Sequence, residues 1–204
     1  MAAVDGQVYA VGGKDKFGDA IKDVEAYTEK RKNWTRVTPL KLAVHNFGIA
    51  ACSDKVYAFG GKLNSRFLKP TSVAQCFDPI QDEWTFVKQL PEPAAYIKAC
   101  TVKSKIYLVG GSLSCVLCYD PQQDFYEKMA AKLAPWNHCS ASVCGSEIYI
   151  TGGRLDVSGR VNSASGPHAQ VQCYDVSSNT MSVGSVKGLP VPLYAHHTVT
   201  VSKH

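Results

Sequence analysis

The sequence predicts an all-β protein, a segment of a β-propeller with four four-stranded blades. Three observations predict this fold. A Gly-Gly pair occurs four times, a tyrosine stands three residues before each pair, and a second aromatic side chain follows each pair with a bulky residue seven positions later. Internal repeats of 20 to 50 residues are typical of solenoids and propellers. No segment has apolar residues at helical spacing over a useful length, so helices are not expected.

The Gly-Gly pairs mark the ends of short buried strands. Each pair ends a run of four residues that is mainly apolar, at 8–11, 56–59, 106–109 and 148–151. Runs of this length that stop at glycines indicate buried strands followed by turns. In the first repeat we expect strands near 7–11, 23–28, 33–37 and 47–52, and the same pattern three more times.

A hairpin follows in each repeat, between the second aromatic residue and the bulky residue. Three repeats have Asp directly after the aromatic residue, which favours a turn because an Asp side chain can bond the turn backbone. The aromatic residues are Tyr27, Phe77, Tyr119 and Tyr174, the bulky residues are Trp34, Trp84, Tyr126 and Met181, and the aspartates are Asp78, Asp120 and Asp175.

The spacing between these positions shows which part of the repeat varies. The bulky residue and the first Gly of the next pair are always 26 residues apart, whereas the distance from the second Gly to the next aromatic residue ranges from 8 to 21. One loop per repeat therefore carries the variation. Loops of variable length on a rigid frame suit a binding surface.

The constant stretch holds a fourth strand rich in small residues, which suits the crowded centre of a propeller. Four short strands in about 42 to 50 residues match one blade. The repeats run approximately over 4–52, 53–102, 103–144 and 145–201, and we expect the first to open in its Gly-Gly strand without a small-residue strand before it.

Composition sets limits on function. The 204 residues carry a net charge of +5, which is too small to indicate nucleic-acid binding. No apolar stretch approaches the ~20 residues that cross a bilayer, and the N-terminus lacks the pattern of a signal peptide. We therefore expect a cytoplasmic protein with reduced cysteines, and leave the nucleus open.

Taken together, these positions resemble the kelch-repeat family, and the resemblance extends from about Val4 to Val201. Met181 in place of Trp and Thr28 in place of Asp depart from its pattern. The resemblance implies that the segment belongs to a six-bladed ring. The sequence around Cys76–Pro79 and Trp84 is similar to the kelch proteins that also carry BTB and BACK regions, neither of which is present in this chain.

That resemblance implies a protein-interaction module without enzymatic activity. The first hypothesis is the substrate-recognition part of a BTB-kelch adaptor for cullin-3 ubiquitin ligases, which would contact cullin-3 only through a BTB domain. The alternative is a kelch scaffold that binds actin or another cytoskeletal partner, and the remote alternative is a propeller enzyme.

Chemical sites are not evident in the sequence. Cys115 and Cys118 have the spacing of a redox pair or half a metal site, but Cys118 also fits the position before the repeat aromatic residue, and free cysteines behave as small apolar residues. His196 and His197 are adjacent, so a strand would point them to opposite faces. We predict no metal site, no cofactor and no catalytic residues.

The candidate site is a rim of loop residues. In kelch adaptors the partner lies over one face of the propeller, and the resemblance implies contacts from residues just after each Gly-Gly pair and just before each innermost strand. This set is basic, aromatic and rich in amides, which suits an acidic or hydroxyl-bearing protein or peptide. It comprises Lys14, His45, Asn46, Lys62, Asn64, Arg66, Tyr96, Ser112, Asn137, His138, Arg154, Tyr194 and His196.

Overall fold

The computed structural model describes residues 1–64, 69–132, 136–155 and 166–199. Within these ranges the chain forms strands and turns and contains no helix. The described residues accordingly include no helix long and apolar enough to span a membrane. The predicted all-β class is confirmed.

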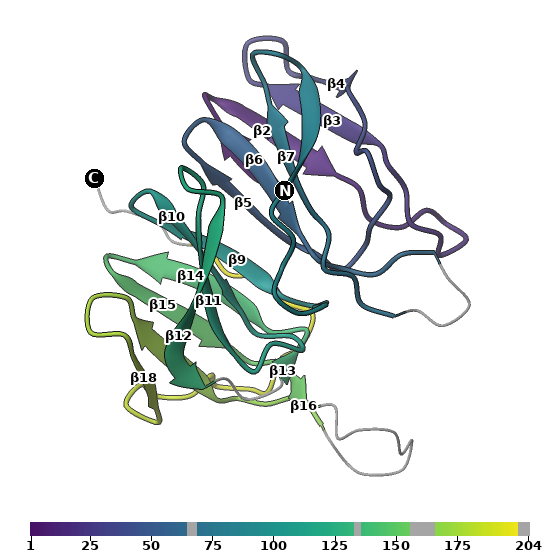
Figure 1. Ribbon diagram of the computed structural model, residues 1–204. Helices are drawn as coiled ribbons and strands as arrows, with labels where there is room; N and C mark the ends of the chain where they lie inside the picture. The colour runs from purple at the N-terminus through teal and green to yellow at the C-terminus, as the bar shows by residue number, and fades with distance from the viewer. Residues whose placement is uncertain (65–68, 133–135, 156–165, 200–204) are drawn as a thin grey trace. The chain divides into compact units, whose positions relative to one another are not determined.

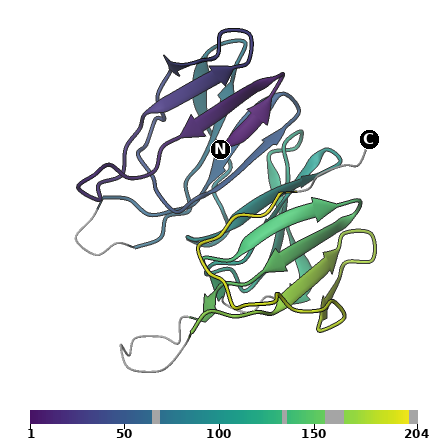
Figure 2. The same cartoon turned by 180° about the vertical axis from the view of Figure 1, so that it is seen from behind.

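The chain divides into two compact units (Figures 1 and 2). Unit 1 comprises 1–95 with 120–125, and unit 2 comprises 96–119 with 126–204. Across the described residues there are four four-stranded antiparallel sheets, as predicted. Two of them belong to unit 1 and two to unit 2, except that 120–125, at the turn of the third sheet, are counted with unit 1. We number them sheet 1 to sheet 4 in chain order.

In unit 1, sheets 1 and 2 follow chain order from strand to strand. Sheet 1 consists of β1 (Ala2–Val4), β2 (Gln7–Val11), β3 (Val24–Thr28) and β4 (Asn33–Val37). Sheet 2 consists of β5 (Gly48–Cys52), β6 (Lys55–Phe59), β7 (Ala74–Asp78) and β8 (Glu83–Val87). The strands expected near 7–11, 23–28, 33–37 and 47–52 are therefore all present.

Unit 2 repeats the pattern and adds a short ribbon. Sheet 3 consists of β9 (Lys98–Val102), β10 (Lys105–Val109), β11 (Cys115–Asp120) and β12 (Phe125–Lys132). Sheet 4 consists of β14 (Ser140–Cys144), β15 (Glu147–Thr151), β17 (Val171–Asp175) and β18 (Thr180–Val183). The ribbon pairs β13 (Trp136–Asn137) with β16 (Arg154–Leu155).

The expectation that no small-residue strand precedes 7–11 was wrong. β1, with the sequence Ala2-Ala3-Val4, pairs with β2 and completes sheet 1. The missed signal is Asp5-Gly6, which joins the two strands with positive φ angles of 46° and 70°. Asp-Gly between two short apolar runs is a strong sign of a two-residue hairpin turn.

The small-residue strand opens each sheet instead of closing it. β5 pairs with β6 across the two-residue turn Ser53-Asp54, and so belongs with the strands that follow it in the chain. Both turn residues have positive φ angles, as a type I′ turn requires. Each sheet is thus displaced by one strand from the sequence repeat.

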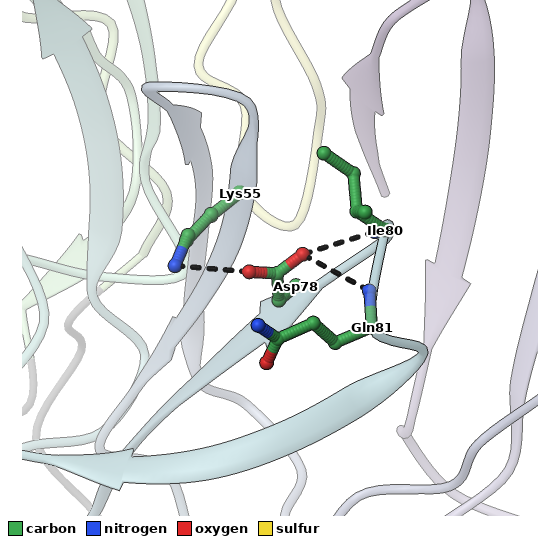
Figure 3. Close-up of polar contacts among 4 residues, drawn as sticks. All are labelled: Lys55, Asp78, Ile80 and Gln81. Carbon is green, nitrogen blue, oxygen red and sulfur yellow. Dashed lines mark hydrogen bonds and ion pairs between the residues drawn. The ribbon is translucent and has the colours of Figure 1, made fainter.

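The predicted Asp turns are present at the ends of the third strands. Asp78 Oδ1 accepts hydrogen bonds from the backbone N–H groups of Ile80 and Gln81, at 2.9 and 3.3 Å, while Asp78 Oδ2 lies 3.1 Å from Lys55 Nζ (Figure 3). The Lys55 ammonium and these N–H groups lower the pKa of the Asp78 carboxyl. Asp120 and Asp175 bond the backbone of their own turns in the same way.

A single apolar cluster joins the two sheets of unit 1. It includes Tyr9 and Val24 from sheet 1 and Phe77 and Trp84 from sheet 2. The ring centroids of Tyr9 and Phe77 are 5.5 Å apart in an edge-to-face arrangement, which is favourable for two aromatic rings. This packing fixes the positions of the loops that carry the candidate site in unit 1.

Polar contacts also join these two sheets. Trp84 is fully buried, and its Nε1 donates a hydrogen bond of 3.0 Å to the carbonyl oxygen of Thr38, just beyond β4. The Asp82 carboxylate accepts bonds from the backbone N–H and the hydroxyl of Thr38, at 3.1 and 3.0 Å. The β7–β8 turn of sheet 2 therefore holds the end of the outer strand of sheet 1.

Candidate partner-binding site

The Gly-Gly turns bring the two predicted groups of rim residues together within each unit. The N–H of the second glycine donates a hydrogen bond to a backbone carbonyl, which in the first three cases lies four residues before β5, β9 or β14. In the fourth case the acceptor, Leu193, is followed by no strand in the described residues. The pairs are Gly13 with Val44 at 3.2 Å and Gly61 with Ala94 at 2.8 Å in unit 1, and Gly111 with Trp136 at 2.9 Å and Gly153 with Leu193 at 2.8 Å in unit 2.

Close approach at these turns requires glycine. Gly60 has a φ of +63°, and a Cβ there would collide with the carbonyl oxygen of Ala94. Gly152, at the same position in sheet 4, has a φ of +55° and would meet the carbonyl oxygen of Leu193. Only glycine adopts such backbone angles without strain while leaving room for another chain segment.

We call the rim residues of unit 1 the unit 1 loop cluster, namely Lys14, His45, Asn46, Lys62 and Asn64. His45 and Lys62 form an antiparallel bridge in which each backbone N–H donates to the other carbonyl, at 3.1 and 2.8 Å. Lys14 is exposed, Lys62 is partly exposed and His45 is buried. The backbone therefore holds the imidazole and a lysine side by side.

Asn64 has a structural contact inside this cluster. Its Oδ1 accepts a bond of 2.6 Å from the backbone N–H of Ala20, and its Nδ2 donates a bond of 3.3 Å to the Ala20 carbonyl. It thereby ties the loop after β6 to the loop after β2. Arg66, the remaining rim residue predicted in this part of the chain, lies outside the described residues.

Burial and the two lysines of the unit 1 loop cluster disfavour the protonation of His45. The side chain is only 2% exposed, and neither buried ring nitrogen makes a well-formed hydrogen bond within the described residues. The Asn46 amide is the uncharged polar side chain that acts on the ring. Burial lowers the pKa of His45, and the positive charges of Lys14 and Lys62 lower it further, while the Asn46 amide acts in the opposite direction. Burial in a medium of low polarity disfavours the charged imidazolium.

We call the corresponding residues of unit 2 the unit 2 loop cluster, namely Tyr96, Ser112, Asn137, His138, Arg154 and Tyr194. Asn137 and Arg154 are direct partners in the β13–β16 ribbon. The rings of Tyr96 and His138 are 4.3 Å apart between centroids and tilted by 47°. Arg154, Ser112 and Tyr194 are exposed, and 53% of Tyr194 is accessible.

His196 was also predicted for the rim, but its contacts are those of a packing residue. Its Nε2 lies 2.9 Å from Thr151 Oγ1, and its Cε1 would be 2.7 Å from a Cβ at Gly152. Burial, followed by Lys98 and His197, lowers its pKa. The position in the repeat is the same as that of Phe47 and Ile97, both of which face inward.

Sequence reasoning missed two residues of this region, Trp136 and His168. Their rings stack with centroids 5.8 Å apart and an interplanar angle of 20°. The backbone N–H of His168 donates to Gly153, as Ile21 and Thr71 donate to Gly13 and Gly61. Ile21, Thr71 and His168 each stand six residues before a repeat aromatic residue, so this spacing could have identified His168, whereas it gives no signal for Trp136.

The cysteines have structural surroundings. All eight are free, and Cys118 is buried in β11 while Cys115 is partly exposed at the start of the same strand. Positions three apart in a strand point to opposite faces, so these two thiols cannot converge on one ion. Among the described residues no group of three or more His, Cys, Asp or Glu side chains could hold a metal ion.

The comparisons with known proteins agree with this fold. The family model for the kelch motif matches residues 1–41 and 43–91. Kelch-like protein 35 from Mus musculus is 33% identical over 114 residues, which cover 56% of this chain and 19% of that protein. Kelch repeat and BTB domain-containing protein 12 from Homo sapiens is 25% identical over 132 residues, which cover 57% of this chain and 20% of that protein.

A solved structure extends the match in fold to nearly the whole chain. The structure of YjhT superimposes with a TM-score of 0.80 at 15% sequence identity, covering 96% of this chain and 72% of that one. The molecule is therefore a segment of a β-propeller. The kelch motif matches 1–41 and 43–91, and the chain resembles the kelch region of kelch-like proteins, of which it matches only about a fifth of the length. The fold and the relatives together support a protein-interaction propeller.

Proposed function

We propose that this chain is the substrate-recognition part of a BTB-kelch adaptor for cullin-3 ubiquitin ligases, and that each loop cluster, within its own unit, binds acidic groups of the protein partner. The observation that carries the proposal is the pairing of Arg154 with Asn137 in a two-residue ribbon next to a Gly-Gly turn. This pairing presents an exposed guanidinium beside an amide on two paired strands.

Electrostatics favour an acidic partner. Lys14, Lys62 and Arg154 are the charged rim residues in the described loops, and all three are cationic. A charge-assisted hydrogen bond contributes about 1.5–3 kcal/mol when it is desolvated. Arg can grip a carboxylate with two parallel bonds, whereas Lys provides a single point charge.

Similarity to a relative that is named for a BTB domain supports the adaptor role. Human kelch repeat and BTB domain-containing protein 12 matches 57% of this chain. In a protein with that arrangement, the kelch segment would bind the substrate and the BTB domain would contact cullin-3. Contact with cullin-3 would therefore require a region outside this chain.

Affinity purification with quantitative mass spectrometry tests the proposal. We expect Arg154→Ala to reduce recovery of the specific partners more than Lys62→Ala, while Lys32→Ala in the β3–β4 turn leaves recovery unchanged. The three variants should have the same circular dichroism spectrum as the unmodified chain. If Lys32→Ala is the damaging substitution and Arg154→Ala binds normally, the site lies on the sheet edge and the assignment is wrong.

Two further arms separate the possible partners. Co-purification of cullin-3 with a longer form that includes a BTB domain, but not with this chain, is expected for the adaptor role. Cosedimentation with filamentous actin that is lost in Arg154→Ala would instead favour the cytoskeletal alternative.

A further inference from the structure

The buried imidazole of His45 is not explained by the packing of unit 1. The side chain is 2% exposed, and no hydrogen-bond partner is present for Nδ1 or Nε2 in the described part of the chain. Buried polar groups in folded proteins nearly always have such partners, and an exception calls for an explanation. The Asn46 amide is the uncharged polar side chain that acts on the ring, so His45 has hydrogen-bonding capacity that the fold itself does not fully use.

Packing alone does not require a histidine at this position. The equivalent residue of the next repeat is Ala95, which is 1% exposed and lies directly before Tyr96 as His45 lies before Asn46. Both Asn46 and Tyr96 have positive φ angles, 56° and 60°, so the two loops have matching backbone conformations. A small apolar residue thus fills the same site in the second repeat.

The surroundings of His45 favour an anion. The charged groups that act on its ring are Lys14, from the loop after β2, and Lys62, from the loop after β6. Lys62 is also its backbone partner, at N···O distances of 2.8 and 3.1 Å. The ammonium groups of Lys14 and Lys62 disfavour protonation of the nearby imidazole, but they attract a carboxylate.

We propose that His45 recognises a carboxylate that the partner brings between Lys14 and Lys62, and that His45 takes up a proton as this carboxylate docks. The proton comes from solvent and binds the free ring nitrogen, and the resulting imidazolium donates an N–H to a carboxylate oxygen. The inference rests on the proposed function and deepens it, because it assigns a chemical group of the partner to one subsite.

The sign of the pH dependence follows from the two states of the ring. In the free protein, burial and the two lysines hold the pKa of His45 below its ordinary value. In the complex, the carboxylate raises it, since an opposite charge favours the charged form. Binding therefore strengthens as pH falls between the bound and free pKa values, by up to about tenfold per pH unit.

Isothermal titration calorimetry with a defined probe tests this coupling. The probe is a tetraglutamate peptide with acetylated and amidated ends, and the matched control is the tetraglutamine peptide. With the whole chain we expect tetraglutamate to bind at least about threefold more tightly at pH 6.0 than at pH 8.0. The heat of binding should depend on the ionisation enthalpy of the buffer in the way that proton uptake requires.

The decisive variant is His45→Gln, because the glutamine amide can still form hydrogen bonds but cannot titrate in this pH range. We expect it to bind tetraglutamate with the same affinity at both pH values and without proton uptake. Lys14→Met and Lys62→Met should each weaken binding several-fold, and Lys32→Met should not. In the unmodified chain the ¹H NMR signal of the His45 ring should report a rise in pKa on addition of tetraglutamate, which does not depend on the folding of any variant.

The possible failures are distinguishable. In one outcome, tetraglutamate binding requires Lys14 and Lys62, but His45→Gln keeps the full pH dependence or the His45 NMR signal does not shift. The inference about His45 is then wrong, while the proposal of an acidic partner stands. If tetraglutamate does not bind at all while Arg154→Ala still loses its cellular partners, the subsite is wrong and the proposed interaction module stands.

Discussion

Sheets 1 and 2 of unit 1 contain the same aromatic pair in two different environments. In sheet 1 the rings of Tyr27 and Trp34 are 5.3 Å apart, and in sheet 2 the rings of Phe77 and Trp84 are 5.2 Å apart. Yet Trp34 is 42% exposed and Trp84 is fully buried. The pairing within a sheet is therefore local, whereas burial depends on another sheet.

The difference arises at Thr38, the residue that directly follows β4, the outer strand of sheet 1. Thr38 accepts the bond from the Trp84 indole and donates two bonds to Asp82. In sheet 1, the residue equivalent to Asp82 is Lys32, which stands four positions after Thr28 as Asp82 stands four after Asp78. The comparison shows that burial of the tryptophan in sheet 2 depends on the sheet that precedes it in the chain.

The largest expected effect separates the two tryptophans. Trp84→Ala should destabilise the protein by about 3–5 kcal/mol, because it leaves a cavity in the core and the partly buried Thr38 carbonyl without its donor. Trp34→Ala should cost about 1 kcal/mol, since part of that side chain is already in water. Urea unfolding followed by far-ultraviolet circular dichroism would measure both. Equal losses would refute the role assigned to the neighbouring sheet.

The next effect compares Gly12 and Gly60, the first glycine of each Gly-Gly pair in unit 1. Gly60→Ala places its Cβ against the backbone of Ala94, which cannot move easily, whereas Gly12→Ala meets Leu40 Cδ1 at 2.9 Å and the Val44 carbonyl oxygen at 3.1 Å. We expect a loss of about 2–4 kcal/mol for Gly60→Ala and a smaller loss for Gly12→Ala.

Gly6→Ala is the control for backbone strain alone. Gly6 has a φ of +70°, and a Cβ added there would have no heavy atom within 4 Å apart from its chain neighbours. Thermal unfolding of the three variants should rank them Gly60→Ala, Gly12→Ala and Gly6→Ala, from the largest loss to the smallest. A loss for Gly6→Ala as large as that for Gly60→Ala would mean that conformation, and not close approach, sets the cost.

A smaller effect concerns the polar contact between the sheets. Asp82→Ala removes both bonds to Thr38 and should cost about 1 kcal/mol. Asp82→Asn can keep one acceptor and should lose less, while Lys32→Ala at the equivalent position of sheet 1 should change stability by less than about 0.5 kcal/mol. The midpoint of urea unfolding distinguishes the three. A neutral Asp82→Ala would show that the contact contributes nothing measurable.

The smallest effect is a change in titration. Lys55 is the largest cause of the lowered pKa of Asp78, so Lys55→Met should raise that pKa toward the ordinary value near about 3.9. A carboxyl with a lowered pKa contributes stability above its unfolded-state pKa and loses it as pH falls through the folded-state value. The variant should therefore show a smaller decline in stability below about pH 4.

Carboxyl ¹³C NMR of Asp78 measures this directly. The backbone donors Ile80 and Gln81 remain in the variant, so some lowering of the pKa should persist. An unchanged pKa would show that these donors, and not Lys55, set the value.

Much of the fold was predictable because its signals are local. A tyrosine three residues before Gly-Gly predicts a buried strand and the turn that ends it, and Asp78, Asp120 and Asp175 bond the backbone of the turns they were expected to form. Asp5-Gly6 was a local signal of the same kind, and reading it would have predicted β1. The rim positions were predictable because the repeat places equivalent residues in equivalent loops.

The environments of the site residues were not predictable in this way. Asn64 bonds Ala20, 44 positions earlier, and His196 lies beside Thr151, 45 positions earlier. The residue types suggest surface contacts, but these partners give both side chains structural roles. Likewise, the sequence does not show that His45 is buried or that its backbone pairs with Lys62.

The sequence by itself determined the strands, the hairpin turns and the repeat, because backbone conformation depends on neighbours a few residues away. The tertiary structure decided which aromatic residues are buried and which rim residues are held by internal bonds. These outcomes depend on groups 30 to 50 residues apart in the chain, such as Asp82 with Thr38 and Trp84 with the same residue. Whether a side chain is buried depends on the residues that cover it, and for Trp84 some of these residues come from another repeat.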